Sequence, residues 1–153
     1  MNIKETLFML DSFCKANDIE YMVTGTTALA LLGIPSNPQD IDIKVFHLKE
    51  YQRSKLKELQ FLAGLENDVY EAECYSFIIN GVKINAIQDY TQDCSEILSN
   101  EVILSIPDEV HNEYHSIGVQ LVFHALKDKM RLRRDKDKDY MLNLIANLMS
   151  LKN

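Results

Sequence analysis

Residues 33–46 read GIPSNPQDIDIKVF and place two aspartates in a stretch that otherwise has the character of a buried strand. Aspartate is one of the residues that strands disfavour, so the pair needs an explanation. Side chains two residues apart in a strand lie on the same face, about 6.5–7 Å apart along the backbone. Asp40 and Asp42 are therefore expected to share one face, while the alternating isoleucine and valine side chains enter the core from the other.

A divalent metal ion would explain the two carboxylates. Side by side in a partly dry site they repel each other, and one would keep its proton unless a cation neutralised both. Oxygen ligands of this kind suit Mg²⁺, which commonly binds one or two carboxylates together with the phosphates of a substrate. We predict that Asp40 and Asp42 hold Mg²⁺ or Mn²⁺. The alternative is an acidic surface pair, in which Asp40 caps a loop and Asp42 faces solvent.

A glycine turn lies 15 residues before the first of these aspartates. The preceding residues 19–24, IEYMVT, predict a short buried strand, and Gly25 permits a tight turn into the helix that follows. The start of that helix would offer free N–H groups to an anion, and Thr26 and Thr27 would add hydroxyl donors. Such a turn is more often a simple cap. Together with the aspartates, it predicts a site in which one element holds triphosphate oxygens and the other holds a metal.

The rest of the chain predicts an α+β fold with a mixed sheet. Helical spacing of apolar residues alternates with strand-like spacing, and Asn80-Gly81 is a strong hairpin signal. No repeat or linker interrupts the pattern. The expected helices cover 3–16, 28–33, 47–59 and two segments after 123, and the expected strands cover 19–24, 39–46, 69–79, 82–88 and, more weakly, 101–106 and 116–122.

Length and composition indicate one domain over residues 1–153. The longest apolar stretch, YMVTGTTALALLGI, is too short and too interrupted to cross a bilayer, so no membrane association is expected. The N-terminus has none of the features of a secretory signal, which favours a cytoplasmic protein. Three cysteines without metal-type spacing are expected to be reduced, with Cys14 a core residue on the first helix.

The charge is negative and unevenly spread. A net charge of −7 makes general nucleic-acid binding unfavourable, because such binding needs surplus cations. Residues 127–139 are the exception, with seven Lys or Arg against four Asp. Cations spaced three or four apart in this segment would either face phosphates from one side of a helix or form a solvated surface.

The sequence VTGTTALALLG followed by QDIDIKV resembles the signature of the DNA polymerase β-type nucleotidyltransferase superfamily. That signature is a glycine-containing turn followed by Asp-x-Asp on the next strand. The likeness is greatest to small bacterial members, including the minimal nucleotidyltransferases and the AbiEii-type toxin-related group. Those proteins also carry a Lys and a Lys-Asp element on their C-terminal helices, a position that corresponds here to Lys127, Lys136, Asp137 and Asp139.

The resemblance implies a mixed β-sheet flanked by helices, with further helices at the C-terminus. It also implies transfer of a nucleoside monophosphate from an NTP to a hydroxyl, phosphate or protein acceptor, with release of pyrophosphate. By matched position, the implied nucleotide contacts are Gly25, Thr26, Thr27 and Lys127, and the implied metal ligands are Asp40 and Asp42.

The strand GVKINAI departs from the family pattern, because Asn85 stands where active members have a third carboxylate. An amide oxygen ligates a metal weakly, and asparagine cannot serve as a general base. Asn85 thus completes the predicted catalytic set with the two aspartates and leaves two functions open. One is a Mg²⁺-dependent nucleotidyltransferase. The other is a catalytically silent nucleotide-binding or regulatory protein of a toxin–antitoxin-like kind. Glu71 or Glu73 would replace the missing carboxylate only if the strand register placed one beside Asp42; otherwise both face solvent.

His111 and His115 are four residues apart and would form a metal-binding pair only on a helix. Pro107 lies shortly before them, and polar residues separate them. A polar loop is therefore the preferred prediction for this segment.

Overall fold

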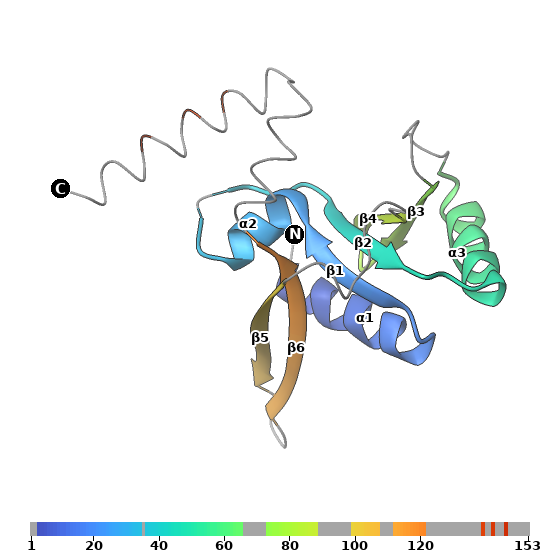
Figure 1. The fold of residues 1–153 in the computed structure, drawn as a ribbon, viewed down its shortest axis with the longest axis horizontal. Coiled ribbons are helices and arrows are strands. Elements are labelled where there is room, and N and C mark those ends of the chain that lie inside the picture. The colour runs from blue at the N-terminus through green and yellow to red at the C-terminus, as the bar shows by residue number, and fades with distance from the viewer. Residues whose placement is uncertain are drawn as a thin grey trace.

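The predicted α+β class is confirmed by a computed structural model that describes residues 3–34, 36–65, 73–88, 99–107, 112–121, Asp139, Leu142 and Ala146. These residues form a six-stranded sheet with helices packed on and beside it (Figure 1). The elements are α1 Ile3–Ala16, β1 Glu20–Thr24, α2 Gly25–Leu31, β2 Ile41–Phe46, α3 Glu50–Ala63, β3 Glu73–Ile79, β4 Val82–Gln88, β5 Ser99–Pro107 and β6 Asn112–Gln120.

The sheet is mixed, with strand order β3-β4-β2-β1-β6-β5. β1 runs antiparallel to β2, whereas β2 runs parallel to β4 and β1 runs parallel to β6. The hairpins β3–β4 and β5–β6 form the two ends of the sheet. In Figure 1, α3 lies beside β3, and the β5–β6 hairpin extends from the opposite side of the sheet.

The β3–β4 hairpin confirms the prediction made from Asn80-Gly81. Both residues have positive φ, 53° and 75°, which is the backbone of a type I′ turn. Ile79 and Val82 pair directly across it. The weakly predicted strands after residue 100 are also present, and each is longer than expected.

Several predicted boundaries are wrong by a few residues. α2 spans Gly25–Leu31, where a helix over 28–33 was expected, and α3 ends at Ala63 instead of residue 59. β2 begins at Ile41, so Gln39 and Asp40 form a bend before the strand and are not its first residues. α3 begins at Glu50, three residues later than expected, because His47 has a φ of 51° and cannot start a helix. The helices expected after residue 123 lie outside the described residues, apart from three single residues that are helical.

The core lies between α1 and the sheet. Ile41, Ile43 and Val45 are at most 1% exposed, which confirms that these side chains face the core. Cys14 on α1 is 1% exposed, and burial raises the pKa of its thiol to about 12, as expected of an inert core cysteine. Within the described part of the chain, no helix is long and apolar enough to span a bilayer.

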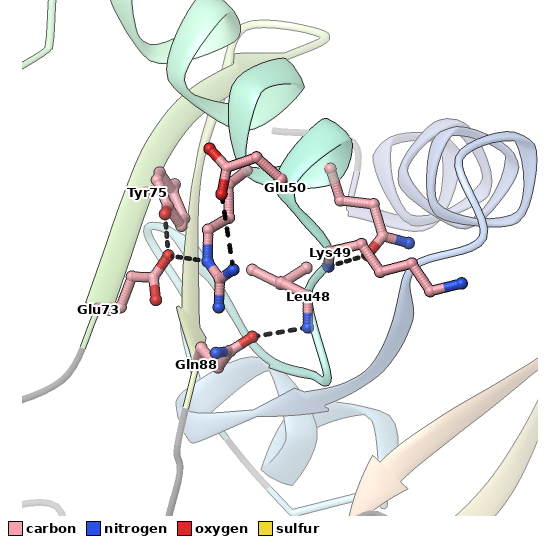
Figure 2. A network of polar contacts seen from close by, with 8 residues as sticks. Leu48, Lys49, Glu50, Glu73, Tyr75 and Gln88 are labelled. Atoms are coloured by element: carbon pink, nitrogen blue, oxygen red, sulfur yellow. Dashed lines mark hydrogen bonds and ion pairs between the residues drawn. The ribbon is translucent and has the colours of Figure 1, made fainter.

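A network of polar contacts fastens the start of α3 to the sheet and to α1 (Figure 2). The Gln88 side chain accepts the Leu48 N–H at 2.9 Å, and the Gln52 side-chain oxygen accepts the Lys49 N–H at 2.7 Å. The Gln52 amide group also donates to two backbone carbonyls at the end of α1, those of residues 17 and 18. These contacts satisfy the polar groups at the helix start and fix its position.

A buried carboxylate joins α1, β1 and β6. The Asp11 side chain accepts the Tyr21 hydroxyl at 2.5 Å, and Lys15 Nζ and His115 Nδ1 each lie 2.6 Å from its second oxygen. The His115 ring also packs on Phe8, with ring centroids 4.3 Å apart. Burial raises the pKa of Asp11, but the contacts with Lys15, Tyr21 and His115 outweigh it and hold the pKa below its usual value. The prediction of a polar loop is therefore wrong for His115, which belongs to a strand; His111 lies outside the described residues.

Tyr21→Phe removes one hydrogen bond to this buried carboxylate and should lower the free energy of unfolding by about 1.5 kcal/mol at pH 7. The hydroxyl helps to keep the folded-state pKa of Asp11 below its unfolded value. Its contribution is therefore present above the unfolded pKa of about 3.9 and is lost as the pH falls through the folded one. Urea unfolding at several pH values measures this. Tyr51→Phe, on an exposed tyrosine of α3, is the matched control and should change nothing.

Candidate functional site

Gly25 and Asp42 meet where β1, α2 and β2 join. Gly25 has a φ of 65°, in the left-handed region that favours glycine, and it begins α2 immediately after β1. The residue before it, Thr24, pairs with Asp42 in the β1–β2 ladder. A Cβ atom added to Gly25 would lie 3.0 Å from Asp42 Oδ2. The carboxylate thus lies against the backbone of the turn, in space that a larger residue would fill.

A line of hydrogen bonds across three strands orients this carboxylate. The Asn85 side-chain amide donates to Asp42 Oδ1 at 2.9 Å, and the Ser76 hydroxyl donates to Asn85 Oδ1 at 2.8 Å. The three residues are neighbours in the register of β2, β4 and β3. Ser76 and Asn85 are 0% and 4% exposed, so the line is protected from water. The hydrogen bond from Asn85 holds Oδ1 of Asp42, and Oδ2 of the same carboxylate faces Gly25.

Asn85 takes a different part in the site from the one expected of it. The sequence suggested that its amide oxygen would be a weak metal ligand. In the structure that oxygen accepts the Ser76 hydroxyl, and the atom beside Asp42 is a nitrogen, which has no lone pair to offer a cation. Asn85 positions Asp42 by donating a hydrogen bond.

Asp40 lies in the bend before β2, exposed to solvent. The Thr27 hydroxyl donates to the Asp40 carbonyl at 3.1 Å, and the Ser36 hydroxyl donates to the Thr26 carbonyl at 3.1 Å. Two side-chain hydrogen bonds therefore hold the loop from residue 36 to residue 40 against α2. Thr27 is 1% exposed and its hydroxyl serves the loop, so the phosphate contact predicted for it stays a prediction, as does that of Thr26.

The place where β1, α2 and β2 join is called the corner below, and the structure does not bring every predicted residue to it. Glu73 pairs with Gln88, three rows from the row that contains Asn85. Its carboxylate accepts Arg53 Nε at 2.9 Å and also the Tyr75 hydroxyl (Figure 2). Glu73 is therefore neither beside Asp42 nor solvent-facing, and both expectations for it are wrong. The predicted residues Glu71, Lys127, Lys136 and Asp137 lie outside the described residues, and Asp139 is exposed.

Sequence reasoning missed two lysines that share a face of the sheet with Asp42. Lys44 is two residues after Asp42 on β2, and Lys83 is two residues before Asn85 on β4. Strand alternation in the sequence was enough to find Lys44. To place Lys83 on the same face, the register between β2 and β4 must be known, because it brings Asn85 opposite Asp42.

The oxygen donors of the corner fit a hard divalent cation. Among the described residues, no group of three His, Cys, Asp or Glu side chains could hold a metal ion. Asp42 lies against the Gly25 turn, and Asp40 is in the exposed bend two residues before it; the turn and this bend are called the cradle below. Mg²⁺ is commonly held by one or two carboxylates and the phosphates of its substrate. The donor set therefore suits an ion that arrives with a phosphate ligand.

Comparisons with known proteins place the fold. No protein-family model matches this sequence, and neither does any curated protein. Two solved structures do match. A proposed nucleotidyltransferase from Thermotoga maritima is 17% identical, with a TM-score of 0.56 and 96% of each chain covered. An antigenic nucleotidyltransferase-like protein from Paracoccidioides brasiliensis is 15% identical, with a TM-score of 0.54, and the match covers 93% of this chain and 73% of that one. At these identities the likeness concerns the fold, which is nucleotidyltransferase-like.

Proposed function

We propose that this chain is a Mg²⁺-dependent nucleotidyltransferase, which transfers a nucleoside monophosphate from an NTP to a hydroxyl, phosphate or protein acceptor. The contact between Gly25 and Asp42 carries the proposal. A carboxylate oxygen directed at a glycine turn, with a second aspartate on the adjoining loop, is an arrangement suited to a cation with a triphosphate. The nucleotidyltransferase-like fold of the two neighbours supports it.

Asp40 and Asp42 are the residues that would hold the ion. When bound, Mg²⁺ supplies charge neutralisation for the phosphates. The chain's own residues position the metal ligand Asp42. Gly25 leaves room for the Asp42 carboxylate against the backbone, and Asn85 keeps Asp42 in one orientation. Phosphoryl transfer depends mainly on placement and electrostatics, so few residues need to act.

A second function is favoured by one specific observation. Asn85 is buried and donates a hydrogen bond to Asp42, so the third carboxylate of the family pattern is absent from the neighbouring strand. An amide in this position cannot accept a proton from the acceptor. A catalytically silent protein of the same fold, which binds nucleotide and acts in regulation or in a toxin–antitoxin-like pair, would retain the cradle and lack turnover.

Binding and transfer are separated by two measurements on the same chain. With NTP and Mn²⁺ at about 100 times Kd, the melting temperature should rise by roughly 5–10 °C. Asp42→Asn should abolish this rise, because it removes the carboxylate charge from the cradle. Asp18→Asn is the matched control, since Asp18 is exposed, has a φ of 54° that asparagine tolerates, and lies away from the site.

Incubation with labelled NTP, Mg²⁺ or Mn²⁺ and cell extract then distinguishes the two functions. Transfer of label to an acceptor, lost in Asp42→Asn, supports the enzyme. Saturable NTP binding without transfer supports the silent protein. If neither NTP nor metal changes the melting temperature of the unmodified chain, both functions are wrong and the domain has no nucleotide site.

A further inference from the structure

Lys83 lies on the face of the sheet that carries Asp42, at the end where Gly25 begins α2. β4 runs parallel to β2, and Asn85 stands opposite Asp42. Lys83 is two residues before Asn85 and therefore on the same face, one step further toward the start of both strands. That step brings it level with the loop that carries Asp40.

This corner of the sheet is open to solvent. Asp40 is exposed and Lys83 is partly exposed. Ile78, which pairs with Lys83 across the β3–β4 ladder, is 49% exposed although it belongs to a strand. In contrast, Asn85 and Ser76, the next pair on the same face of the sheet, are almost fully buried. Lys83 is therefore accessible to a ligand at the end of β4 that lies level with the loop of Asp40.

A triphosphate needs a cation at this place. The chain has a net charge of −7, and the two aspartates of the cradle add local repulsion toward phosphates. The helix that begins at the cradle, α2, has no basic residue to offset this. Lys44 shares the face of Asp42 but lies two residues further along β2, away from the end where Gly25 lies.

We propose that Lys83 binds the phosphate chain of the nucleotide, as the cation that complements the two aspartates of the cradle. The proposal rests on the proposed nucleotide site and adds a residue to it. A lysine ammonium is a compact charge on a flexible stem, and it binds phosphate as a point charge. Lys83 then contributes in proportion to the number of phosphates on the ligand.

The test measures Kd by isothermal titration for ATP, ADP, AMP and inorganic tripolyphosphate, each with Mn²⁺ and at constant ionic strength. Lys83→Met should raise the Kd for ATP and tripolyphosphate about tenfold, the loss expected of one charge-assisted hydrogen bond. The effect should decrease from ATP to ADP to AMP. Lys83→Arg keeps the charge and should restore most of the affinity.

Two lysines provide controls with the same charge change. Lys57→Met alters an exposed lysine of α3 away from the corner and should leave every Kd unchanged. Lys44→Met should have a smaller effect than Lys83→Met. If Lys83→Met weakens ATP no more than Lys57→Met does, or weakens AMP as much as ATP, the assignment of Lys83 is wrong and the nucleotide site stands without it. If the unmodified chain binds neither ATP nor tripolyphosphate, the nucleotide site itself is wrong.

Discussion

Replacement of Gly25 by alanine should weaken NTP binding about 10- to 150-fold, the loss expected when a charge-assisted contact worth about 1.5–3 kcal/mol is displaced. The new methyl group would lie 3.0 Å from Asp42 Oδ2, closer than nine in ten real Cβ contacts come to a neighbour. Asp42 is also held through its other oxygen by Asn85, so the carboxylate cannot move away without breaking a partly buried hydrogen bond. Titration of NTP with Mn²⁺ measures the effect.

Gly64→Ala is a closely matched control for this substitution. Gly64 ends α3 with a φ of 68°, almost the same as the 65° of Gly25, and a Cβ atom there would meet nothing within 4 Å. Alanine in the left-handed region should cost each variant about 1–2 kcal/mol of stability. Only Gly25→Ala should lose nucleotide affinity. Equal affinities in the two variants would show that the contact between Gly25 and Asp42 is irrelevant to binding.

Asn85→Asp should lower the free energy of unfolding by about 3–5 kcal/mol at pH 8 in EDTA, the cost of an uncompensated buried charge. The substitution replaces a donor nitrogen by a carboxylate oxygen 2.9 Å from Asp42 Oδ1, in a position that is 4% exposed. The repulsion should raise the folded-state pKa of one carboxyl above its unfolded value. The variant should therefore approach wild-type stability at low pH and lose it as the pH rises through that raised pKa.

A divalent cation should reverse the effect. Mn²⁺ should raise the melting temperature of Asn85→Asp more than that of the unmodified chain, because the variant offers a third carboxylate. The same substitution should increase any nucleotidyl transfer, since it restores a group able to accept a proton.

The double variant Asp42→Asn with Asn85→Asp tests whether the two side chains act as a pair. It exchanges carboxylate and amide, so one hydrogen bond can form with reversed polarity and the repulsion disappears. Its stability in EDTA should be close to that of the unmodified chain, which gives a large coupling energy in the double-mutant cycle. Additive effects would contradict the contact between Asp42 and Asn85.

The sequence predicted those parts of the fold that depend on neighbouring residues. Asn80-Gly81 determines its hairpin because both residues accept the left-handed backbone that the turn requires. The bend at Gly25 and the strand of Asp42 were likewise visible in short segments. The start of β2 was misplaced because Pro38 excludes regular structure at its own position and does not determine where pairing with β1 and β4 begins.

The features that were missed depend on contacts between residues far apart in the chain. Asn85 lies 43 residues from Asp42, and only the register of β2 against β4 shows that its nitrogen faces the carboxylate. His115 was assigned to a loop from Pro107 and the polar residues nearby; its partner, Asp11, belongs to the first helix and cannot be recognised from the segment itself. Glu73 was considered for the site because it lies on the strand next to that of Asn85. Only the register shows that it pairs with Gln88, well away from Asn85.

The polar network at the start of α3 lies at the end of β2 and β4 remote from the Gly25 corner (Figures 1 and 2). Gln52 links that helix to the residues after α1 through two backbone carbonyls. This network thus holds α3 at one end of the sheet, and the residues that would meet a ligand lie at the other end. Exposed and partly exposed side chains at that end, such as Asp40 and Lys83, can therefore be exchanged at less cost to the fold than the buried residues that hold α3, whereas the buried Asn85 cannot.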